Sequence, residues 1–285
     1  MALGNLACAP SKMRIIIVIP CFNLWNQYTK RCLDSIRTSH SHRIVLVDNG
    51  STDETFQEAS RLIGPSFVYR RNESNSGTCK AWNWGISRSF EDAADANLAL
   101  VLNNDVLLHP ECIDRLVARM DRGDDRLGVL TAMDVRQEIA GPQALFSMRA
   151  EDRAGFAERD GANFSAFMLT RSSWERVGPF DEAFYPAYFE DNDYIYRTRL
   201  AGLLTVTLPT ALFYHYGCRT QPEAFAAPTV ARSAFLRCQD YYIRKWGGTP
   251  EAERFRTPFG GRYVEDPQPL GEGAERAGAV RALEL

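Results

Sequence analysis

The chain has 285 residues, of which 45% are hydrophobic and 24% are charged, and its formal net charge is −3. This is enough apolar material for one large domain or for two halves that share a core. Nucleic acid is disfavoured as the main partner, because the chain has no excess of Lys and Arg to neutralise phosphates. Seven scattered cysteines, none spaced as CxxC, indicate a reduced compartment and no zinc knuckle.

The apolar runs are of strand length, such as Ile15 to Pro20, and none is long enough to span a bilayer. We therefore expect a soluble protein that is at most peripheral at a membrane. From about Pro250 onward the sequence is rich in Gly, Pro, Glu and Arg and poor in apolar residues. This composition predicts a flexible tail over residues 251–285.

The first hundred residues alternate between apolar runs and helical patterns. Ser51 and Glu54 have the spacing of a capping box, which predicts the start of a helix there. Nearly continuous β-branched runs separated by helices predict a parallel sheet that is covered on both faces. The predicted strands are Arg14–Pro20, Arg43–Asp48, Phe67–Arg70 and Leu98–Leu102, and the predicted helices are Asn26–Ile36, Thr52–Leu62 and one through Trp82 to Phe90.

The second half is less regular. The polar stretch Asp134 to Asn163 is longer than a usual connection, so it is either a functional loop or poorly ordered. The predicted helices are Glu111–Met120, a short capped one at Ser172–Glu175, Asp193–Ala201 and Thr229–Trp246, and the predicted strands are Gly128–Met133, Phe164–Thr170, Thr205–Leu208 and Leu212–Tyr216.

Polar residues follow the buried strand Leu98–Leu102 directly, as Asn103, Asn104 and Asp105. The carboxyl ends of buried strands are where open α/β sheets bind their ligands. A carboxylate there can hold Mg²⁺ or Mn²⁺ against a diphosphate, because these ions take oxygen ligands from one or two carboxylates and from the phosphates. A simple polar turn is the alternative explanation.

A second acidic cluster runs from Glu190 to Asp193, after a segment rich in aromatic residues. A carboxylate from this cluster could take a proton from an incoming hydroxyl, and aromatic walls beside carboxylates suit a pocket for sugar rings. The alternatives are a solvated helix start, where acids suit the helix dipole, and an aromatic core. A metal-held leaving group together with a base is what sugar transfer from a nucleotide donor requires.

Three further positions each have two explanations. Asp48 ends a predicted strand, where it could bind a ribose or the ring N–H of a base, but it could equally form a turn and helix cap. Gly77 and Lys80 lie where a loop enters a helix, a place that favours anions, although a bare turn explains them too. His215 lies on a strand and is more often a core residue than a metal ligand in such a place.

The order of these motifs resembles glycosyltransferase family 2 with the GT-A fold. The resemblance covers about residues 13 to 250. The segments that carry it are Val18–Asn23, Val47–Asp53, Asn75–Gly77 with Ala81, Asn83, Gly85 and Ile86, Leu102–Asp105, Gly178–Glu182, Tyr188–Asp193, Arg197, Gly202, His215 with Gly217, and Tyr241–Gly247.

The resemblance implies an α/β fold of the GT-A (Rossmann-like) type. This is a mixed, mostly parallel sheet flanked by helices, in a single compact domain with a C-terminal helix. Residues 13–110 would form the half that binds the nucleotide sugar, and residues 111–250 the half that binds the acceptor.

The resemblance also assigns site residues. Asp191 matches the catalytic base, and Asp105 with His215 matches the ligands of Mg²⁺ or Mn²⁺. We take a further three residues as candidates for the acceptor site, namely Glu190, Tyr188 and Trp174. The positions that match the nucleotide-sugar site are Pro20, Asn23, Asp48, Gly77, Lys80, Asn103 and Asn104.

One departure from the family pattern concerns the metal. Asn103 replaces the first Asp of the D-x-D motif, so the site loses a charge and weaker metal affinity is expected. This departure keeps open a nucleotide-sugar-binding protein without turnover. A sugar nucleotidyltransferase is a second alternative, although the chain has no Gly- and Arg-rich triphosphate loop near its first strand.

We therefore expect an inverting transferase that moves one hexosyl or deoxyhexosyl group, because the Q-x-x-R-W signature of processive synthases is missing. The favoured donors are UDP and dTDP sugars. The expected acceptor is a hydroxyl of a glycan, a lipid-linked molecule or a protein in cell-surface glycan assembly. The expected location is cytoplasmic, with a peripheral contact at the inner face of the membrane.

Overall fold

The computed structural model describes residues 14–93, 95–217 and 228–261. These residues form a nine-stranded sheet with the order β3-β2-β1-β4-β8-β6-β9-β5, and β7 pairs with β9 beside this path. The strands are β1 (Ile15–Cys21), β2 (His42–Asp48), β3 (Phe67–Arg71), β4 (Leu98–Leu102), β5 (Val106–Leu108), β6 (Leu127–Asp134), β7 (Arg159–Asp160), β8 (Ala166–Thr170) and β9 (Leu204–His215).

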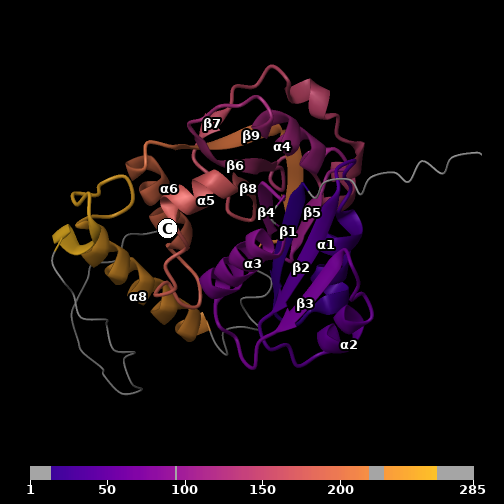
Figure 1. The fold of residues 1–285 in the computed structure, drawn as a ribbon, viewed down its shortest axis with the longest axis horizontal. Helices are drawn as coiled ribbons and strands as arrows, with labels where there is room; N and C mark the ends of the chain where they lie inside the picture. Colours follow the sequence, from indigo (N-terminus) through magenta and orange to yellow (C-terminus); the bar gives the residue numbers. More distant parts are fainter. Residues whose placement is uncertain (1–13, 94, 218–227, 262–285) are drawn as a thin grey trace, which may run out of the picture.

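The sheet is mixed but mostly parallel, as expected. Strands β1 to β4 are parallel to one another, and β6 is parallel to β9. Strand β8 lies between β4 and β6 and is antiparallel to both, while β5 and β7 are antiparallel to β9. Six of the nine described strands therefore run in one direction (Figure 1). The reversal at β8 brings its amino end beside the carboxyl end of β4.

Helices cover both faces of the sheet. The alternating residues of β1 separate two cores, because Ile15 and Ile17 pack with α1, α2 and α4 residues, whereas Ile16 and Val18 pack with α3, α5, α6 and α8 residues. The helices are α1 (Lys30–Ser35), α2 (Thr55–Ser60), α3 (Thr78–Asp92), α4 (Cys112–Met120), α5 (Arg171–Val177), α6 (Glu190–Leu200) and α8 (Pro228–Trp246), with a π-helical turn η1 (Trp25–Thr29) and 3₁₀ turns η2 (Pro142–Ser147), η3 (Ala150–Arg153) and η4 (Pro258–Gly261).

Two sequence predictions were wrong in their local detail. The predicted capping box does not form: α2 begins only at Thr55, and Ser51 donates both its N–H and its hydroxyl to Asp48 instead. The two strands predicted in residues 205–216 are the single strand β9. The register shift between Ala132 and Met133 of β6 lies opposite Pro209, which cannot donate a backbone hydrogen bond.

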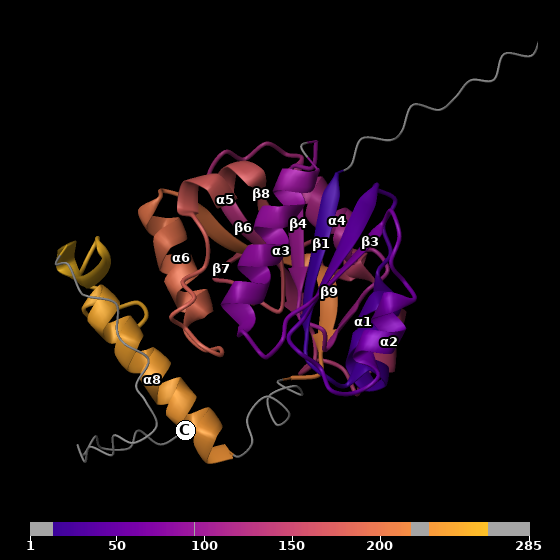
Figure 2. The ribbon, with the colours of Figure 1, turned by 60° about the horizontal axis from the view of Figure 1, so that its bottom comes forward.

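Helix α3 packs closely on β1 at Gly85. A Cβ atom at this position would lie 2.3 Å from Cγ1 of Val18, so only glycine lets helix and strand approach this far. Because α3 lies directly against β1 and β2, this approach fixes its first turn beside the carboxyl ends of those strands (Figure 2).

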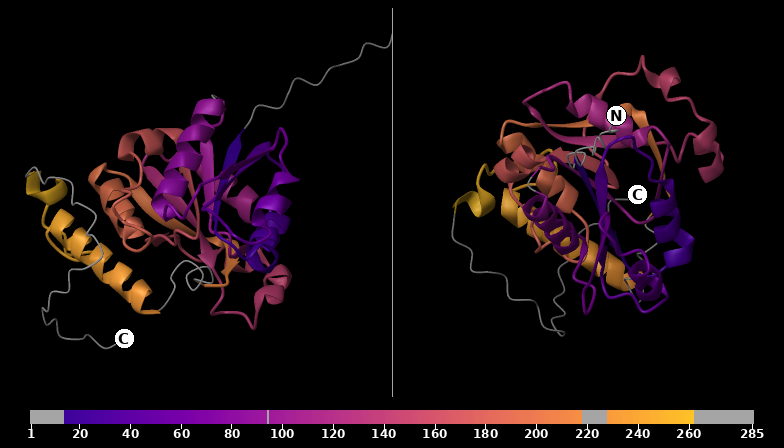
Figure 3. Two further views of the ribbon diagram at one scale, coloured as in Figure 1. Left: turned by 90° about the horizontal axis from the view of Figure 1, so that it is seen from below. Right: turned by 45° about the vertical axis from the view of Figure 1, so that its right-hand side comes forward.

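Helix α8 runs along the outside of the layer that contains α3 and α6 (Figures 2 and 3). Buried charges hold its last turn, where Nζ of Lys245 lies 2.6 Å from carboxylate oxygens of both Asp181 and Asp193. The indole N–H of Trp246 also donates to Asp193, at 2.8 Å. Removing one partner from such a buried ionic group generally costs about 3–5 kcal/mol, so this network fixes α8 firmly to α6.

The predicted tail overlaps only in part with the described chain. Its first residues fold back on α8, because the N–H groups of Arg254 and Phe255 both donate to the carbonyl of Trp246. Residues 262–285 lie outside the described residues. Within the described part of the chain, no helix combines the length and the apolar character needed to cross a bilayer.

Candidate active site

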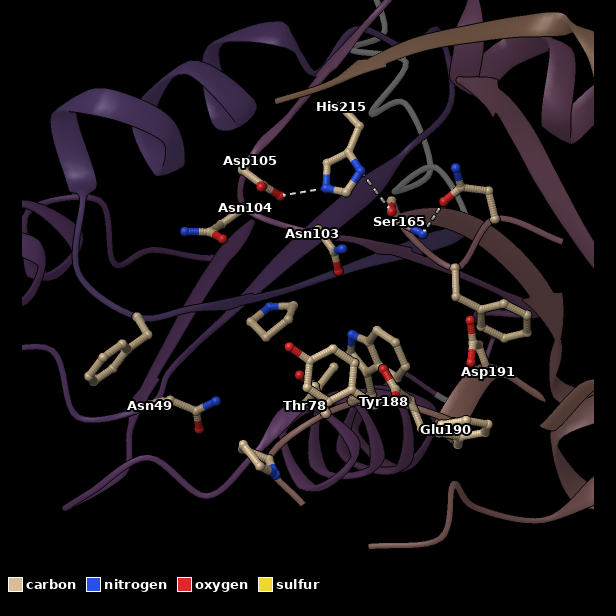
Figure 4. Close-up of a pocket in the computed structure, with 18 of the residues that line it drawn as sticks. Asn49, Thr78, Asn103, Asn104, Asp105, Ser165, Tyr188, Glu190, Asp191 and His215 are labelled. Carbon is tan, nitrogen blue, oxygen red and sulfur yellow. Dashed lines mark hydrogen bonds and ion pairs between the residues drawn. The ribbon is translucent and has the colours of Figure 1, made fainter. Parts of the chain in front are cut away.

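A cavity of about 570 Å³ opens where the parallel strands end. Its wall combines the end of β1, the turn after β4, the segment before β8 and the first turn of α6 (Figure 4). Asp105 and His215 lie on one side in this view, and Glu190 and Asp191 lie on another, with Asn103 between them. Asp105 and the acidic pair Glu190 and Asp191, which lie far apart in the sequence, thus face one cavity.

The pairing of β5 with β9 brings Asp105 and His215 together. Val106 is the register partner of His215, and the N–H of Tyr216 donates to the carbonyl of Asp105 at 2.9 Å. As a result, Nε2 of His215 lies 3.1 Å from Oδ1 of Asp105. The carboxylate of Asp105 and the imidazole of His215 are both largely buried.

Ser165 orients the imidazole from the opposite side. Its Oγ lies 3.3 Å from Nδ1 of His215, and its backbone carbonyl accepts a hydrogen bond from the N–H of Asn103. When Ser165 accepts a hydrogen bond from Nδ1, the lone pair of Nε2 faces the carboxylate of Asp105. Two ligands of one cation have this arrangement, and such an outer hydrogen bond fixes the tautomer of the histidine.

These two side chains fit a divalent cation of the Mg²⁺ or Mn²⁺ type. Ligands about 2.1 Å from one ion at right angles lie about 3 Å apart, close to the separation seen here. The described residues contain no group of three or more His, Cys, Asp or Glu side chains placed to hold a metal ion. A two-ligand site suits an ion that takes its remaining ligands from water and substrate phosphates, and the imidazole suits Mn²⁺ better than Mg²⁺.

The acidic pair enters the cavity on an unusual backbone. Tyr188 and Phe189 have φ angles of 84° and 66°, in the left-handed region that non-glycine residues rarely adopt. Helix α6 begins immediately afterwards, so Glu190 and Asp191 lie in its first turn. Oδ1 of Asp191 accepts a hydrogen bond from the N–H of Asn192 at 2.7 Å. Strained backbone of this kind is often found at functional sites.

Burial makes ionisation of both carboxyl groups harder. It raises the pKa of Glu190 to about 8, with the charge of Asp191 as the second cause. Burial also raises the pKa of Asp191 above its usual range, although the N–H of Asn192 opposes this. Glu190 therefore keeps its proton near pH 7, and the pair carries at most one negative charge there.

Four other predicted residues also line the cavity. Pro20 lies at the end of β1, and Asn103 and Asn104 lie at the turn after β4. Asn104 is buried, and its amide donates to Oγ1 of Thr29 at 2.9 Å, which fixes the turn. Tyr188 lines the cavity on the α6 side.

Asp48 does not line the cavity, because its own chain surrounds its carboxylate. Its Oδ1 accepts hydrogen bonds from the N–H and the hydroxyl of Ser51, and its Oδ2 accepts one from the hydroxyl of Tyr69 at 2.6 Å. Nε of Arg71 lies 3.6 Å from Oδ2. In this structure Asp48 holds the loop after β2, and its neighbour Asn49 lines the cavity instead.

Four more predicted residues lie outside the cavity wall. Lys80 is exposed on α3, and Trp174 is buried against Phe180. The side chain of Asn23 accepts a hydrogen bond from the N–H of Thr52, so it holds the loop after β2. A Cβ at Gly77 would lie 2.9 Å from the ring of Tyr185, so this glycine lets the segment before α6 approach the start of α3.

The aromatic residues that precede the acidic pair have two roles: some form the core, and others line the cavity. Phe180 and Phe184 are core residues, because they are 2% and 0% exposed. Tyr188 and Phe189 line the cavity, where both rings pack against Phe235 of α8. Sequence reasoning missed Phe235 and Ser165 as wall residues. Neither position carries a local signal, since only the pairing of distant elements brings them to the site.

Comparisons with known proteins agree with this geometry. Residues 16–167 match the family model described as glycosyl transferase family 2. The N-acetylglucosaminyl-diphospho-decaprenol L-rhamnosyltransferase of Mycobacterium tuberculosis is 28% identical over 246 residues, which cover 74% of this chain and 79% of that protein.

Solved structures show the same fold at low sequence identity. One is the mannosyltransferase PcManGT from Pyrobaculum calidifontis in complex with GDP-Man and Mn²⁺ (TM-score 0.53, 16% identity, 71% of this chain). Another is GalNAc-T7 with UDP, GalNAc and Mn²⁺ (TM-score 0.54, 16% identity, 73% of this chain). The matched parts span 56% and 44% of those two chains, so this chain corresponds to about half of each.

Proposed function

Because this chain belongs to glycosyltransferase family 2 and is a glycosyltransferase, we propose that it transfers one sugar from a nucleoside-diphosphate sugar to an acceptor hydroxyl, with inversion at the anomeric carbon. The observation that carries this proposal is the single cavity that Asp105 and His215 share with Asp191. Asp105 and His215 suit a diphosphate leaving group, and Asp191 suits an attacking hydroxyl.

The donor nucleotide is assigned to the ends of β1, β2 and β4. Pro20 and Asn49 line this part of the cavity, and Asn103 and Asn104 lie between it and Asp105. Nucleotides bind at this edge of open α/β sheets.

Asp191 is assigned as the general base. Its raised pKa brings its basicity closer to neutral pH, where a base is most effective. Glu190 beside it keeps its own proton near neutral pH, so Asp191 is the carboxyl group of the pair that accepts the hydroxyl proton. The acceptor oxygen then attacks the anomeric carbon from the face opposite the diphosphate, and one base suffices because no covalent intermediate forms.

Asp105 and His215 would hold Mg²⁺ or Mn²⁺. When bound, the ion supplies positive charge that stabilises the negative charge developing on the diphosphate leaving group. The presence of Mn²⁺ in the two solved structures supports this assignment. With Asn103 in place of an acid, a single carboxylate carries the charge of the site.

The acceptor is proposed to be lipid-linked, and the enzyme to act in cell-surface glycan assembly from the cytoplasmic side of a membrane. The name of the mycobacterial relative specifies a diphospho-decaprenol substrate. On α8, Leu236 and Ile243 are 50% and 36% exposed beside Arg232 and Arg237. Such a face suits peripheral contact with an anionic membrane surface, close to the cavity wall at Phe235.

Calorimetric titration of UDP, dTDP and GDP tests the proposal, each with Mn²⁺ and with EDTA, on the wild type and on Asp105→Ala. We expect one nucleotide to bind in a metal-dependent way, and this binding to weaken in the variant. Asp114→Ala is the control, because Asp114 accepts a hydrogen bond from Thr38 and neither residue is in the cavity wall. Nucleotide affinity that is the same with Mn²⁺ and with EDTA, and the same in Asp105→Ala, would contradict the metal assignment. If no nucleotide binds, the donor class is contradicted.

A further inference from the structure

Two polar atoms in the cavity wall have no hydrogen-bond partner. Among the described residues, seven buried side-chain nitrogen and oxygen atoms lack one. Only two of these belong to residues of the cavity wall, namely Nε1 of Trp82 and Oε2 of Glu190. An unpartnered buried polar group destabilises the folded state, so each one in a native structure requires an explanation.

Packing fixes the position of Trp82. The indole is 2% exposed, and its ring lies 4.9 Å from the ring of Phe180 and 5.3 Å from that of Phe167, measured between centroids. The next residue, Asn83, exchanges two hydrogen bonds of 2.8 Å with the backbone of Phe180. The indole therefore cannot turn easily to find another partner.

Trp82 also lies on the correct side of α3. It follows Thr78 by four residues, so both side chains lie on the same face of the helix, and both line the cavity. An indole N–H can only donate a hydrogen bond, so a partner must offer an acceptor oxygen. Glu190, one residue before the proposed base, offers a carboxyl oxygen from α6.

We propose that the indole N–H of Trp82 and the carboxyl group of Glu190 form a subsite for a sugar ring, in which the N–H donates to a hydroxyl or acetamido oxygen and the carboxyl group bonds to a sugar hydroxyl. The inference rests on the proposed function and adds the chemistry of the substrate. The ring is that of the acceptor or that of the donor, and both present such oxygens. A sugar ring presents several such oxygens to the two groups, whereas an apolar alcohol such as cyclohexanol presents a single hydroxyl.

The test uses the ¹⁵N-labelled full chain, which has five Trp residues and hence five indole N–H signals in NMR spectra. The Trp82 signal is assigned by its loss in Trp82→Phe or, if that variant does not fold, by elimination with the other four Trp→Phe variants. Spectra are recorded with the best-binding nucleoside diphosphate and Mg²⁺, because Mn²⁺ broadens the signals. Methyl rhamnoside, methyl N-acetylglucosaminide, methyl galactoside and cyclohexanol are then added in turn, and a nucleotide sugar replaces the nucleotide in a separate arm.

We expect the Trp82 signal to move with at least one sugar and not with cyclohexanol. Movement with a methyl glycoside identifies the acceptor ring, and movement with the nucleotide sugar alone identifies the donor ring. Trp82→Phe and Glu190→Ala should each lower the binding affinity for that sugar by about 3- to 10-fold, the loss expected for one hydrogen bond. Trp84→Phe should not, because Trp84 packs under Arg70 and is not in the cavity wall.

Two results would overturn the inference, and they are distinguishable. If a nucleotide binds but no sugar, free or nucleotide-linked, moves the Trp82 signal, the subsite is wrong while the proposed function stands. If no nucleotide binds, the proposed function fails and the subsite fails with it.

Discussion

Nε2 of His215 lies 3.1 Å from Oδ1 of Asp105, although 110 residues separate the two in the chain. The contact depends on one short antiparallel pairing, in which β9 runs beside β5. Its chemistry depends on a third residue, Ser165, which reaches Nδ1 of the same imidazole from the amino end of β8. The proposed cation site should therefore be sensitive to a residue that would not touch the cation.

Ser165→Ala should weaken metal binding without abolishing it. Loss of the hydroxyl frees the imidazole to rotate, and the loss of such outer partners typically costs about 10- to 100-fold in metal affinity. The Mn²⁺ concentration for half-maximal nucleotide binding should rise by about 10-fold. Ser233→Ala is a matched control, because Ser233 bonds only within α8. An unchanged Mn²⁺ dependence in Ser165→Ala would show that the serine does not orient His215.

Asp191→Asn should lower kcat by about 10²- to 10⁴-fold, the usual contribution of a general base. Nucleotide affinity should stay the same, because Asp191 lies on the other side of the cavity from Asp105 (Figure 4). In the wild type kcat/KM should rise with pH through the raised pKa of Asp191, since only the ionised form accepts a proton. This rising limb should be missing in the variant, and a variant of near-normal activity would refute the assignment.

Glu190→Gln should flatten the pH dependence of stability. In the folded protein the pKa of Glu190 is raised from 4.5 to about 8, so the folded state keeps a proton that the unfolded state releases. The free energy of unfolding should therefore fall as pH rises from about 4.5 to about 8, by at most about 1.4 kcal/mol per pH unit from this group. Urea unfolding of both proteins at pH 5, 6, 7 and 8 measures this. Parallel curves would mean that Glu190 ionises normally.

Gly85→Ala should destabilise the fold by about 1–3 kcal/mol, the usual cost of overpacking a core. The added methyl group would overlap Val18, since its carbon would lie 2.3 Å from Cγ1. Gly155→Ala is the control, because a Cβ there meets no atom within 4 Å. Thermal unfolding of Gly85→Ala and Gly155→Ala compares their stabilities. Equal stability would contradict the close packing of α3 on β1.

Local patterns predicted most of the fold but only part of the site. Strand β4 has the predicted bounds Leu98–Leu102, because a buried apolar run between polar segments has few alternatives. Strand β5 was missed, because three residues carry no periodic signal. Ser51 has the spacing of a helix cap, yet the carboxylate of Asp48 binds both of its donor groups. Here a contact at the strand end replaced the capping that the spacing suggested.

The site residues also divide into those with a local signal in the sequence and those without one. The motif around Asp105 was visible in sequence because it follows a buried strand directly. Ser165, Trp82 and Phe235 were not, because their places in the wall depend on strand reversal and on helix packing between distant segments. Sequence reasoning identified the residues after β4 and the acidic cluster at the start of α6, and missed those that only the packing of distant elements brings to the wall.

The place of β9 in the chain also sets an order of assembly during synthesis. Strands β1 to β4 can pair as soon as they emerge from the ribosome, whereas His215 arrives 110 residues after Asp105. At usual translation rates this interval lasts roughly 5–20 s. On the proposed function, a nascent chain would thus carry the proposed nucleotide end of its cavity well before its proposed cation site, and would not react with donor until β9 had joined the sheet.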